Sequence, residues 1–110
     1  MVLKMIKTNP VNSAFNKVYD LIQQVPKGKV TTYGEIGKKL HMSARVVGFA
    51  LHANPDGSKN PCHRVVNKEG RLAPGFAFGG MSIQKQLLAQ EGVEFKDQNH
   101  VNLKKHLFNF

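Results

Sequence analysis

The chain carries one cysteine, Cys62, in a setting that favours reactivity. It lies in the run PCHR at 61–64, with Lys59 just before it and no acidic residue between Gly57 and Lys68. A cysteine reacts as its thiolate, and nearby cations lower the thiol pKa from about 8.5 to as little as roughly 3.5. The run therefore points to a nucleophilic thiol, although a lone cysteine is more often a small buried apolar residue.

The local geometry decides which partner this thiol can use. On an extended strand, successive side chains point to opposite faces, so Cys62 and His63 would point apart. Pro61 fixes its own φ and restricts Asn60, which favours a defined bend. Two arrangements stay open, a bent chain with direct contact between thiol and imidazole, or a bridging water.

Size and composition indicate a small globular protein. The chain has 110 residues, 41% of them hydrophobic, which predicts one domain with a modest core. One cysteine and five scattered histidines give neither a disulfide nor a zinc-ligand spacing, so we expect no metal and no cofactor. The first ten residues lack the apolar core of a signal peptide, and no apolar stretch approaches the roughly 20 residues that span a bilayer. We expect a cytoplasmic monomer that does not enter membranes.

The net charge is strongly positive and unevenly distributed. It is +9, and six of these charges fall between Lys27 and Arg71, where nine Lys or Arg stand against three acidic residues. A concentrated basic surface attracts phosphate backbones and releases their counterions. The charge therefore favours a nucleic-acid partner, while general solubility or another polyanion is also compatible with it.

Two short helices across a tight break form the clearest structural pattern. Thr32 is expected to cap a helix over Tyr33–Leu40, with Glu35 three residues later completing a capping box. Ser43 is expected to cap a helix over 44–53. Such a pair is typical of a helix-turn-helix unit, whose second helix carries the nucleic-acid contacts.

The outward face of the second helix carries unusual residues. Arg45, Gly48, Phe49 and His52 share this face at helical spacing. Glycine inside a helix is costly, so Gly48 needs a reason. Either a nucleic-acid groove approaches the helix here, or a neighbouring helix packs against it, and the sequence favours neither.

The remaining segments predict two more helices and a small β-hairpin. In chain order we expect a helix at 13–25 capped by Ser13, strands at 63–66 and 71–73 joined by a turn, a Gly-rich loop at 74–80, a helix at 83–91 capped by Ser82, and a tail at 94–110. The expected fold is a mainly α single domain of winged-helix type, with its core at about 13–93.

The order of these motifs resembles a known family. The run NPCHRVVNKEG at 60–70 follows the helix-turn-helix unit, and LLAQEGV lies further on at 87–93. Together they resemble the DNA-binding and active-site domain of the O6-alkylguanine-DNA alkyltransferases, and equally their short relatives, the alkyltransferase-like proteins. The resemblance implies a protein that flips an O6-alkylated guanine out of double-stranded DNA and moves the alkyl group irreversibly to a cysteine.

The resemblance also implies roles for individual residues. Cys62 matches the alkyl acceptor, His63 the base that reaches the thiol through a water, and Glu91 the carboxylate that orients His63. Tyr33 matches the tyrosine that contacts the flipped base, and Arg45 the arginine that fills the gap in the stack. The residues alone leave simpler roles open. Tyr33 could be a half-buried aromatic and Arg45 an ordinary phosphate contact. Glu91 could be a solvated acid at a helix end.

The other implied positions lie at the DNA surface, in a hinge or around the pocket. They are Thr32, Ser43 and Gly48 on the DNA, Asn54 and Pro61 in the hinge with Arg64 bracing it, and Phe78 in the pocket loop. Backbone carbonyls near Cys62 and Val65 would read the guanine amino group. An Asx turn at Asn54 is compatible with its hinge role.

Two departures from the family pattern bear on activity. The family offers Tyr-Ser before Gly-Gly, whereas this chain has Ala77-Phe78, and losing a donor of this kind can slow a reaction by about 10²–10³-fold. Only about fourteen residues precede the first expected helix, as in alkyltransferase-like proteins, which mostly replace the cysteine and flag lesions for nucleotide excision repair. We expect a single-turnover alkyltransferase, with a lesion sensor as the alternative and a transcriptional helix-turn-helix module as a weaker third.

Overall fold

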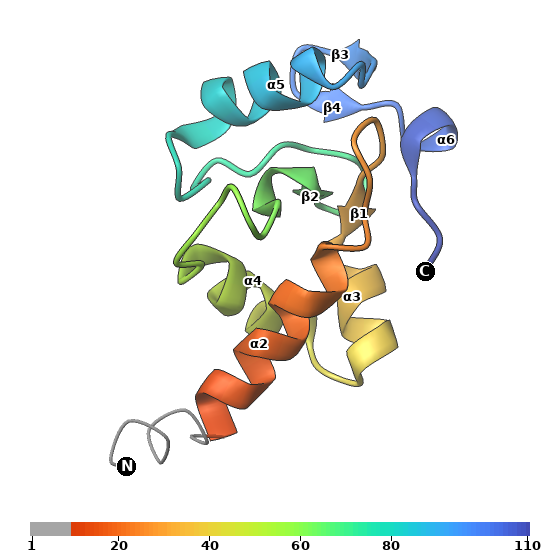
Figure 1. Ribbon diagram of the computed structural model, residues 1–110. Coiled ribbons are helices and arrows are strands. Elements are labelled where there is room, and N and C mark those ends of the chain that lie inside the picture. The colour runs from red at the N-terminus through yellow and green to blue at the C-terminus, as the bar shows by residue number, and fades with distance from the viewer. Residues whose placement is uncertain (1–9) are drawn as a thin grey trace.

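Three helices at one end of the molecule enclose its larger core. The computed structural model describes residues 10–110, and in Figure 1 helices α2 (Pro10–Ile22), α3 (Tyr33–Leu40) and α4 (Ala44–His52) pack together below the strands. Their buried apolar side chains form one cluster that also takes in Cys62. The cysteine therefore belongs to a segment that rests directly on the helical core.

The turn between α3 and α4 forms as the sequence predicts. The Thr32 hydroxyl accepts a hydrogen bond from the Glu35 amide at 3.1 Å, and the Ser43 hydroxyl accepts one from the Val46 amide at 3.2 Å, so both predicted caps are confirmed. The Glu35 carboxylate pairs with Lys38 at 3.5 Å. His41 ends α3 in the left-handed conformation, with φ 57°, which reverses the chain within a few residues.

The predicted hairpin between 63–66 and 71–73 is wrong. Strand β2 (Val65–Val66) pairs in parallel with β1 (Thr31–Thr32), in the register Thr31 to Val65. Two adjacent valines that are both buried suit a parallel pair covered on both faces. The turn at 67–70 exists, but beyond it Arg71 bridges to His100 in the C-terminal segment.

Two helices begin before the serines that we expected to cap them. Helix α2 starts at Pro10, so Ser13 lies inside it, and proline is favoured at the first helical position because its φ suits the helix. Helix α5 (Gly80–Gln90) is preceded by Gly79, with φ 128°, so Ser82 is also internal. Pro10 marks the start of α2 and Gly79 precedes the start of α5, so in neither helix does the serine mark the N-terminus.

The segment expected as a tail is folded. It forms β3 (Phe95–Asp97), β4 (His100–Val101) and α6 (Leu103–His106) beside α5 in Figure 1. Its buried side chains share a second apolar cluster with α5 and β2. The buried His106 ring holds it in place, because Nδ1 donates to the Gly28 carbonyl at 2.8 Å and Nε2 accepts from the Glu94 amide at 2.9 Å. The C-terminal segment is thus fastened to the loop before β1.

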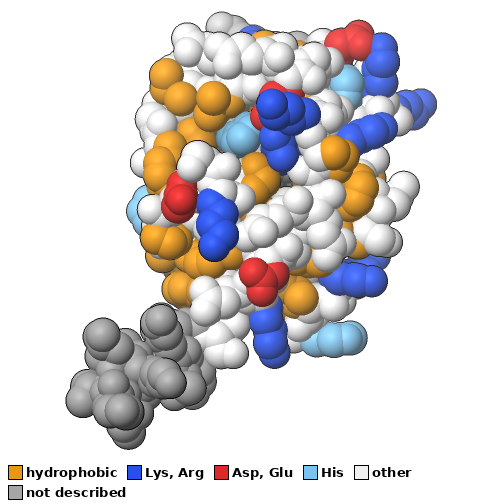
Figure 2. Space-filling model, in the orientation of Figure 1, with side chains coloured by type: hydrophobic (Ala, Val, Ile, Leu, Met, Phe, Trp, Pro, Cys, Tyr) orange, Lys and Arg blue, Asp and Glu red, His pale blue; other side chains and the backbone are white. Residues whose placement is uncertain are grey.

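The surface is consistent with the positive charge of the chain. Figure 2 shows Lys and Arg side chains spread over one face, with hydrophobic side chains reaching the surface between them. Across residues 10–110, no helix combines the length and apolar character needed to cross a membrane. The N-terminal residues 1–9, within the stretch we considered as a targeting signal, lie outside the described residues.

Gly37→Ala should destabilise the protein, because α3 approaches the following turn closely at this point. An added Cβ at Gly37 would lie 2.4 Å from the Met42 carbonyl oxygen, whereas at Gly34, on the same helix, the nearest atom would be 3.9 Å away. We expect Gly37→Ala to cost about 1–3 kcal/mol in urea unfolding. Gly34→Ala is the matched control, which helix propensity should leave neutral or stabilise by up to about 1 kcal/mol. Equal unfolding midpoints for the two variants would contradict the close approach.

Candidate active site

A tight bend places Cys62 at the start of a short helical turn. Pro61 has φ −75° and ψ 68°, and the Cys62 amide donates to the Asn60 carbonyl at 2.7 Å, which is an inverse γ-turn. Residues Cys62–Arg64 then form one turn of 3-10 helix. The expected strand across these residues is therefore wrong, and the bend that Pro61 favours is present. Cys62 and His63 consequently do not take opposite faces of a strand.

Two buried asparagines fix this bend against the end of α4. The Asn54 amide donates to the Asn60 carbonyl at 2.9 Å, and the Asn60 amide donates to Asn54 Oδ1 at 3.0 Å. Asn54 Oδ1 also accepts from the Asp56 amide at 3.1 Å. The brace and the Asx turn therefore coexist at Asn54. Gln23 on the chain after α2 extends the network to Asn60 at 2.8 Å.

The Glu91 carboxylate binds the side chains of both basic residues that follow the cysteine. It lies 2.8 Å from His63 Nε2, and it accepts two hydrogen bonds from the Arg64 guanidinium at 2.9 and 2.8 Å. Arg64 also donates to the Val25 carbonyl at 2.8 Å. Burial opposes the ionisation of Glu91, but the hydrogen bonds from Arg64 and His63 outweigh it and lower the Glu91 pKa. Arg64 thus braces this segment from within, while His63 lies against the acid that the resemblance assigns to it.

The thiol is not activated by its cationic neighbours in the free protein. Cys62 is only 5% exposed. Its burial raises the thiol pKa, although hydrogen bonding from Asn54 acts in the opposite direction. The expectation that the basic run favours the thiolate is therefore wrong for this state. The reason is that Glu91 holds Arg64 and His63, and burial disfavours a charged sulfur.

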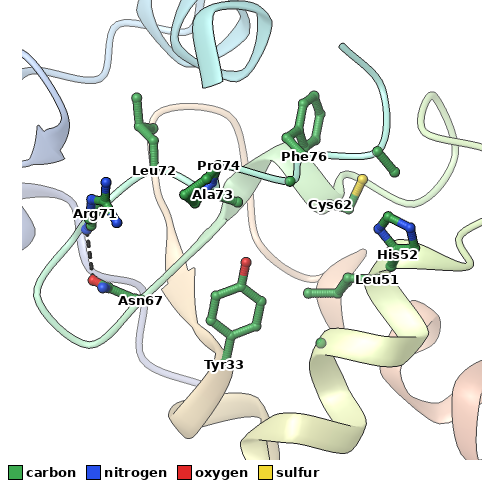
Figure 3. Close-up of a pocket in the computed structure, with 13 residues that line it drawn as sticks. Tyr33, Leu51, His52, Cys62, Asn67, Arg71, Leu72, Ala73, Pro74 and Phe76 are labelled. Carbon is green, nitrogen blue, oxygen red and sulfur yellow. Dashed lines mark hydrogen bonds between the residues drawn. The ribbon is translucent and has the colours of Figure 1, made fainter. Parts of the chain in front are cut away.

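A hollow of about 260 Å³ opens beside the sulfur. We call it the first hollow, and Figure 3 shows the Cys62 sulfur beside Phe76 and His52 at one end, with the Tyr33 hydroxyl pointing into the space. Burial raises the Tyr33 pKa, so the phenol stays a neutral donor. The lining residues are Tyr33, Gly48, Leu51, His52, Cys62, Asn67 and residues 71–77. This wall is mostly apolar with a few polar groups, as in sites that accept a flat aromatic ligand.

A second hollow also borders Cys62. Cys62 and Phe76 line both hollows. The predicted site residues Pro61, His63, Arg64, Phe78 and Glu91 line the second hollow. Phe78 therefore does not line the first hollow, where the loop contributes Ala77 instead.

The residues predicted to contact DNA differ in their surroundings: Gly48 and Arg45 lie on the outward face of α4, whereas Thr32 and Ser43 cap helices. Gly48 reaches the rim of the first hollow, and nothing lies within 4 Å of where its Cβ would stand, so the reading in which a neighbouring helix packs against it is wrong. Arg45 is exposed and stacks over the Phe49 ring, 5.7 Å from its centroid. Thr32 is 6% exposed, and both Thr32 and Ser43 use their hydroxyls as helix caps.

Two contributions to the site escaped the sequence analysis. Gln84 on α5 is fully buried, where it donates to the carbonyls of His63 and Val65 at 3.2 and 3.0 Å and accepts from the Ala73 amide at 2.7 Å. The Val65 carbonyl thus accepts one hydrogen bond inside the protein, and its expected contact with the guanine amino group stays a prediction, since a carbonyl oxygen can accept two. His52 lines the first hollow, and its place on the outward face of α4 was the signal that could have found it.

Metal chemistry has no obvious place in the described part of the chain. Among residues 10–110, no group of three or more His, Cys, Asp or Glu side chains could hold a metal ion. The site offers a thiol at the boundary of an apolar hollow. The imidazole of His63 follows it in sequence, and the Glu91 carboxylate contacts that imidazole.

Comparison with known proteins agrees with this arrangement. The family model described as 6-O-methylguanine DNA methyltransferase, DNA binding domain, matches residues 13–93. The DNA base-flipping protein of Vibrio parahaemolyticus is 40% identical over 92 residues, which cover 82% of this chain and 90% of that protein. The chain belongs to this methyltransferase family, and the resemblance seen in its motifs is confirmed.

Solved structures place the chain among both branches of the family. Atl1 of Schizosaccharomyces pombe, in complex with damaged DNA containing O6-carboxymethylguanine, superimposes with a TM-score of 0.78 at 33% identity, covering 90% of this chain and 97% of Atl1. The O6-methylguanine-DNA methyltransferase of Pyrococcus kodakaraensis gives 0.65 at 38% identity, covering 78% of this chain. The match spans only 48% of that methyltransferase, so the shared part is one region of a longer protein.

Glu91→Gln should destabilise the protein because it leaves a buried guanidinium without its counter-ion. The Arg64 and Glu91 side chains are 12% and 11% exposed, and breaking such a pair costs about 3–5 kcal/mol. The Glu91 pKa lies below its usual 4.5 in the folded state, so this stabilisation is present above that pH and is lost as pH falls through the lower value. Urea unfolding at several pH values should show the gap between wild type and variant narrowing in acid. A gap that does not change with pH would argue against the ion pair.

Proposed function

We propose that this protein binds double-stranded DNA containing O6-alkylguanine, takes the flipped base into the first hollow and accepts the alkyl group on Cys62. The observation that carries the proposal is the position of the Cys62 sulfur, which forms the boundary of an apolar hollow beside Tyr33. A base must leave the stack before its alkyl group can be reached. The hollow offers a mostly apolar wall with a few polar groups, which suits such a base.

The proposed transfer moves one alkyl group and one proton. The thiol proton passes through a bridging water to His63, which Glu91 orients. The sulfur attacks the alkyl carbon, a carbon–sulfur bond forms and the bond from that carbon to guanine O6 breaks. The departing guanine anion takes up one proton from water, His63 returns the thiol proton to solvent, and the restored neutral base remains part of the DNA. Because the thioether is permanent, each molecule acts once.

The electrostatics of the free protein support a central role for His63 as the proton acceptor. Burial raises the Cys62 pKa, so few molecules carry a thiolate before DNA binds. A positioned base that takes the proton during the attack avoids the need for a pre-formed thiolate. The contact of 2.8 Å between His63 Nε2 and Glu91 supports this assignment, since the carboxylate stabilises the imidazolium that forms.

A second candidate is a lesion sensor that binds the same DNA without transfer. Two features favour it: burial raises the Cys62 pKa, and Phe78, which cannot donate a hydrogen bond, stands where the family offers a serine. Under this reading the complex recruits nucleotide excision repair proteins. The proposed setting for both candidates is a cytoplasmic monomer that becomes nucleoid-associated on DNA, consistent with a single free cysteine.

Intact-mass measurement separates the two candidates. Incubated with a duplex carrying O6-methylguanine, the wild-type protein should gain the mass of one methyl group, and peptide mapping should place it on Cys62. The gain should stop at one per molecule, because the acceptor sulfur is consumed. Tight binding of the lesion duplex with unchanged mass would support the sensor and reject transfer.

Two controls make this measurement specific. Cys62→Ala should bind the lesion duplex without gaining mass, because it keeps the hollow and removes the acceptor. The same duplex with plain guanine should leave the wild-type mass unchanged. A protein that binds both duplexes equally would reject both candidates and favour a general DNA-binding module.

Gly48→Ala should separate folding from DNA binding. Nothing lies within 4 Å of the new methyl group, so the free protein should gain up to about 1 kcal/mol of helix stability in urea unfolding. If DNA closes against this rim of the hollow, the methyl group should weaken affinity for the lesion duplex severalfold at fixed salt. Gly34→Ala, also an open position on a helix, should leave affinity unchanged. Unaltered affinity in Gly48→Ala would show that DNA does not approach this glycine.

A further inference from the structure

Helix α4 exposes a large aromatic ring that the proposed function has not used. Phe49 is 56% exposed, the larger value of the two exposed large hydrophobic side chains among the described residues. Single exposed apolar residues are ordinary on protein surfaces, so exposure alone says little about Phe49. The position of Phe49 is more informative, because Phe49 follows Gly48 in sequence and Gly48 lines the first hollow.

The ring is also the resting place of the Arg45 side chain. The guanidinium carbon of Arg45 lies 5.7 Å from the Phe49 ring centroid, a cation–π contact across one helical turn. The opposite face of α4 is buried through Val47, Ala50 and Leu51. Arg45 and Phe49 therefore project together away from the core, and the contact limits the conformations that the long arginine side chain can sample.

Both side chains present flat surfaces that suit nucleobases. A guanidinium plane and an aromatic ring each stack on bases, and DNA-bending proteins insert apolar side chains such as Phe between base steps. When a nucleotide leaves the stack, the neighbouring bases expose two flat apolar faces. An arginine alone covers this opening with one thin plane, whereas the pair covers a larger area.

We propose that Phe49 is a second DNA-contacting residue, which packs against the base or sugar surface that opens when the target nucleotide leaves the duplex. The ring also holds Arg45 in an extended, exposed position before DNA arrives, which reduces the ordering cost of binding. This inference rests on the proposed binding of O6-alkylguanine DNA. It makes Phe49 a determinant of lesion affinity that acts independently of phosphate contacts.

The test compares Phe49→Ala with wild type on an O6-methylguanine duplex and on the same duplex with guanine. We expect lesion affinity to fall about tenfold, within the range that a lost base–aromatic stack produces, with a smaller change on the plain duplex. The slope of log Kd against log salt should stay unchanged, because no phosphate contact is lost. Phe49→Trp keeps a flat ring and should stay within about threefold of wild type.

A control removes a partly buried ring elsewhere that also carries a cation. Phe95 on β3 carries the Lys85 ammonium 5.2 Å from its centroid, and Phe95→Ala should retain wild-type lesion affinity. Thermal unfolding of each variant should show a folded protein before binding is compared. Fluorescence of 2-aminopurine placed beside the lesion should rise on binding wild type and rise less with Phe49→Ala.

The outcomes distinguish this inference from the function on which it rests. A lesion-selective wild type with an unaffected Phe49→Ala would overturn the inference alone. Equal losses on both duplexes together with a smaller salt slope would also overturn it, because they indicate displaced phosphate-binding charges. A wild type without any preference for the lesion duplex would overturn the proposed function and the inference together.

Discussion

The carboxylate of Glu91 joins three parts of the chain that are far apart in sequence. It binds Arg64 and His63 just after the cysteine, while Arg64 also holds the Val25 carbonyl that follows α2. The paired side chains are 11–12% exposed, so this contact is formed in a region where an unpaired charge is strongly unfavourable. The position of Cys62 therefore depends on this acid at the end of α5 as well as on the Asn54–Asn60 brace.

The same contact sets the chemistry of the thiol. Arg64 and His63 would favour a thiolate if they faced the sulfur, but Glu91 holds both, and burial raises the Cys62 pKa. DNA phosphates would raise it further, since a nearby negative charge disfavours a second one. We therefore expect the proposed alkyl transfer to proceed with proton removal during the attack.

Local signals predicted the helical half of the site, and long-range packing decided the rest. Thr32 and Ser43 are caps as predicted, because capping involves only residues within one turn. The partner of β2 could not be read locally, since the turn at 67–70 is real but β1 lies more than thirty residues earlier. Gln84 gave no signal at all, because a glutamine on a helix is usually exposed. The folded segment 95–106 was also missed, since its strands have two or three residues each.

One small fold can serve a transferase and a sensor because the two functions share every step up to the sulfur. In the proposed function, binding uses the basic surface, the outward face of α4 and the first hollow, and all of these are independent of the thiol. The proposed transfer adds a proton acceptor at the sulfur and a donor for guanine O6. This chain keeps Cys62, His63 and Glu91 but has Phe78 where the family offers the serine, and Phe78 lines the second hollow. The balance between the two outcomes therefore depends on whether a neutral phenol such as Tyr33, or an ordered water, can stabilise the departing base in place of the missing serine.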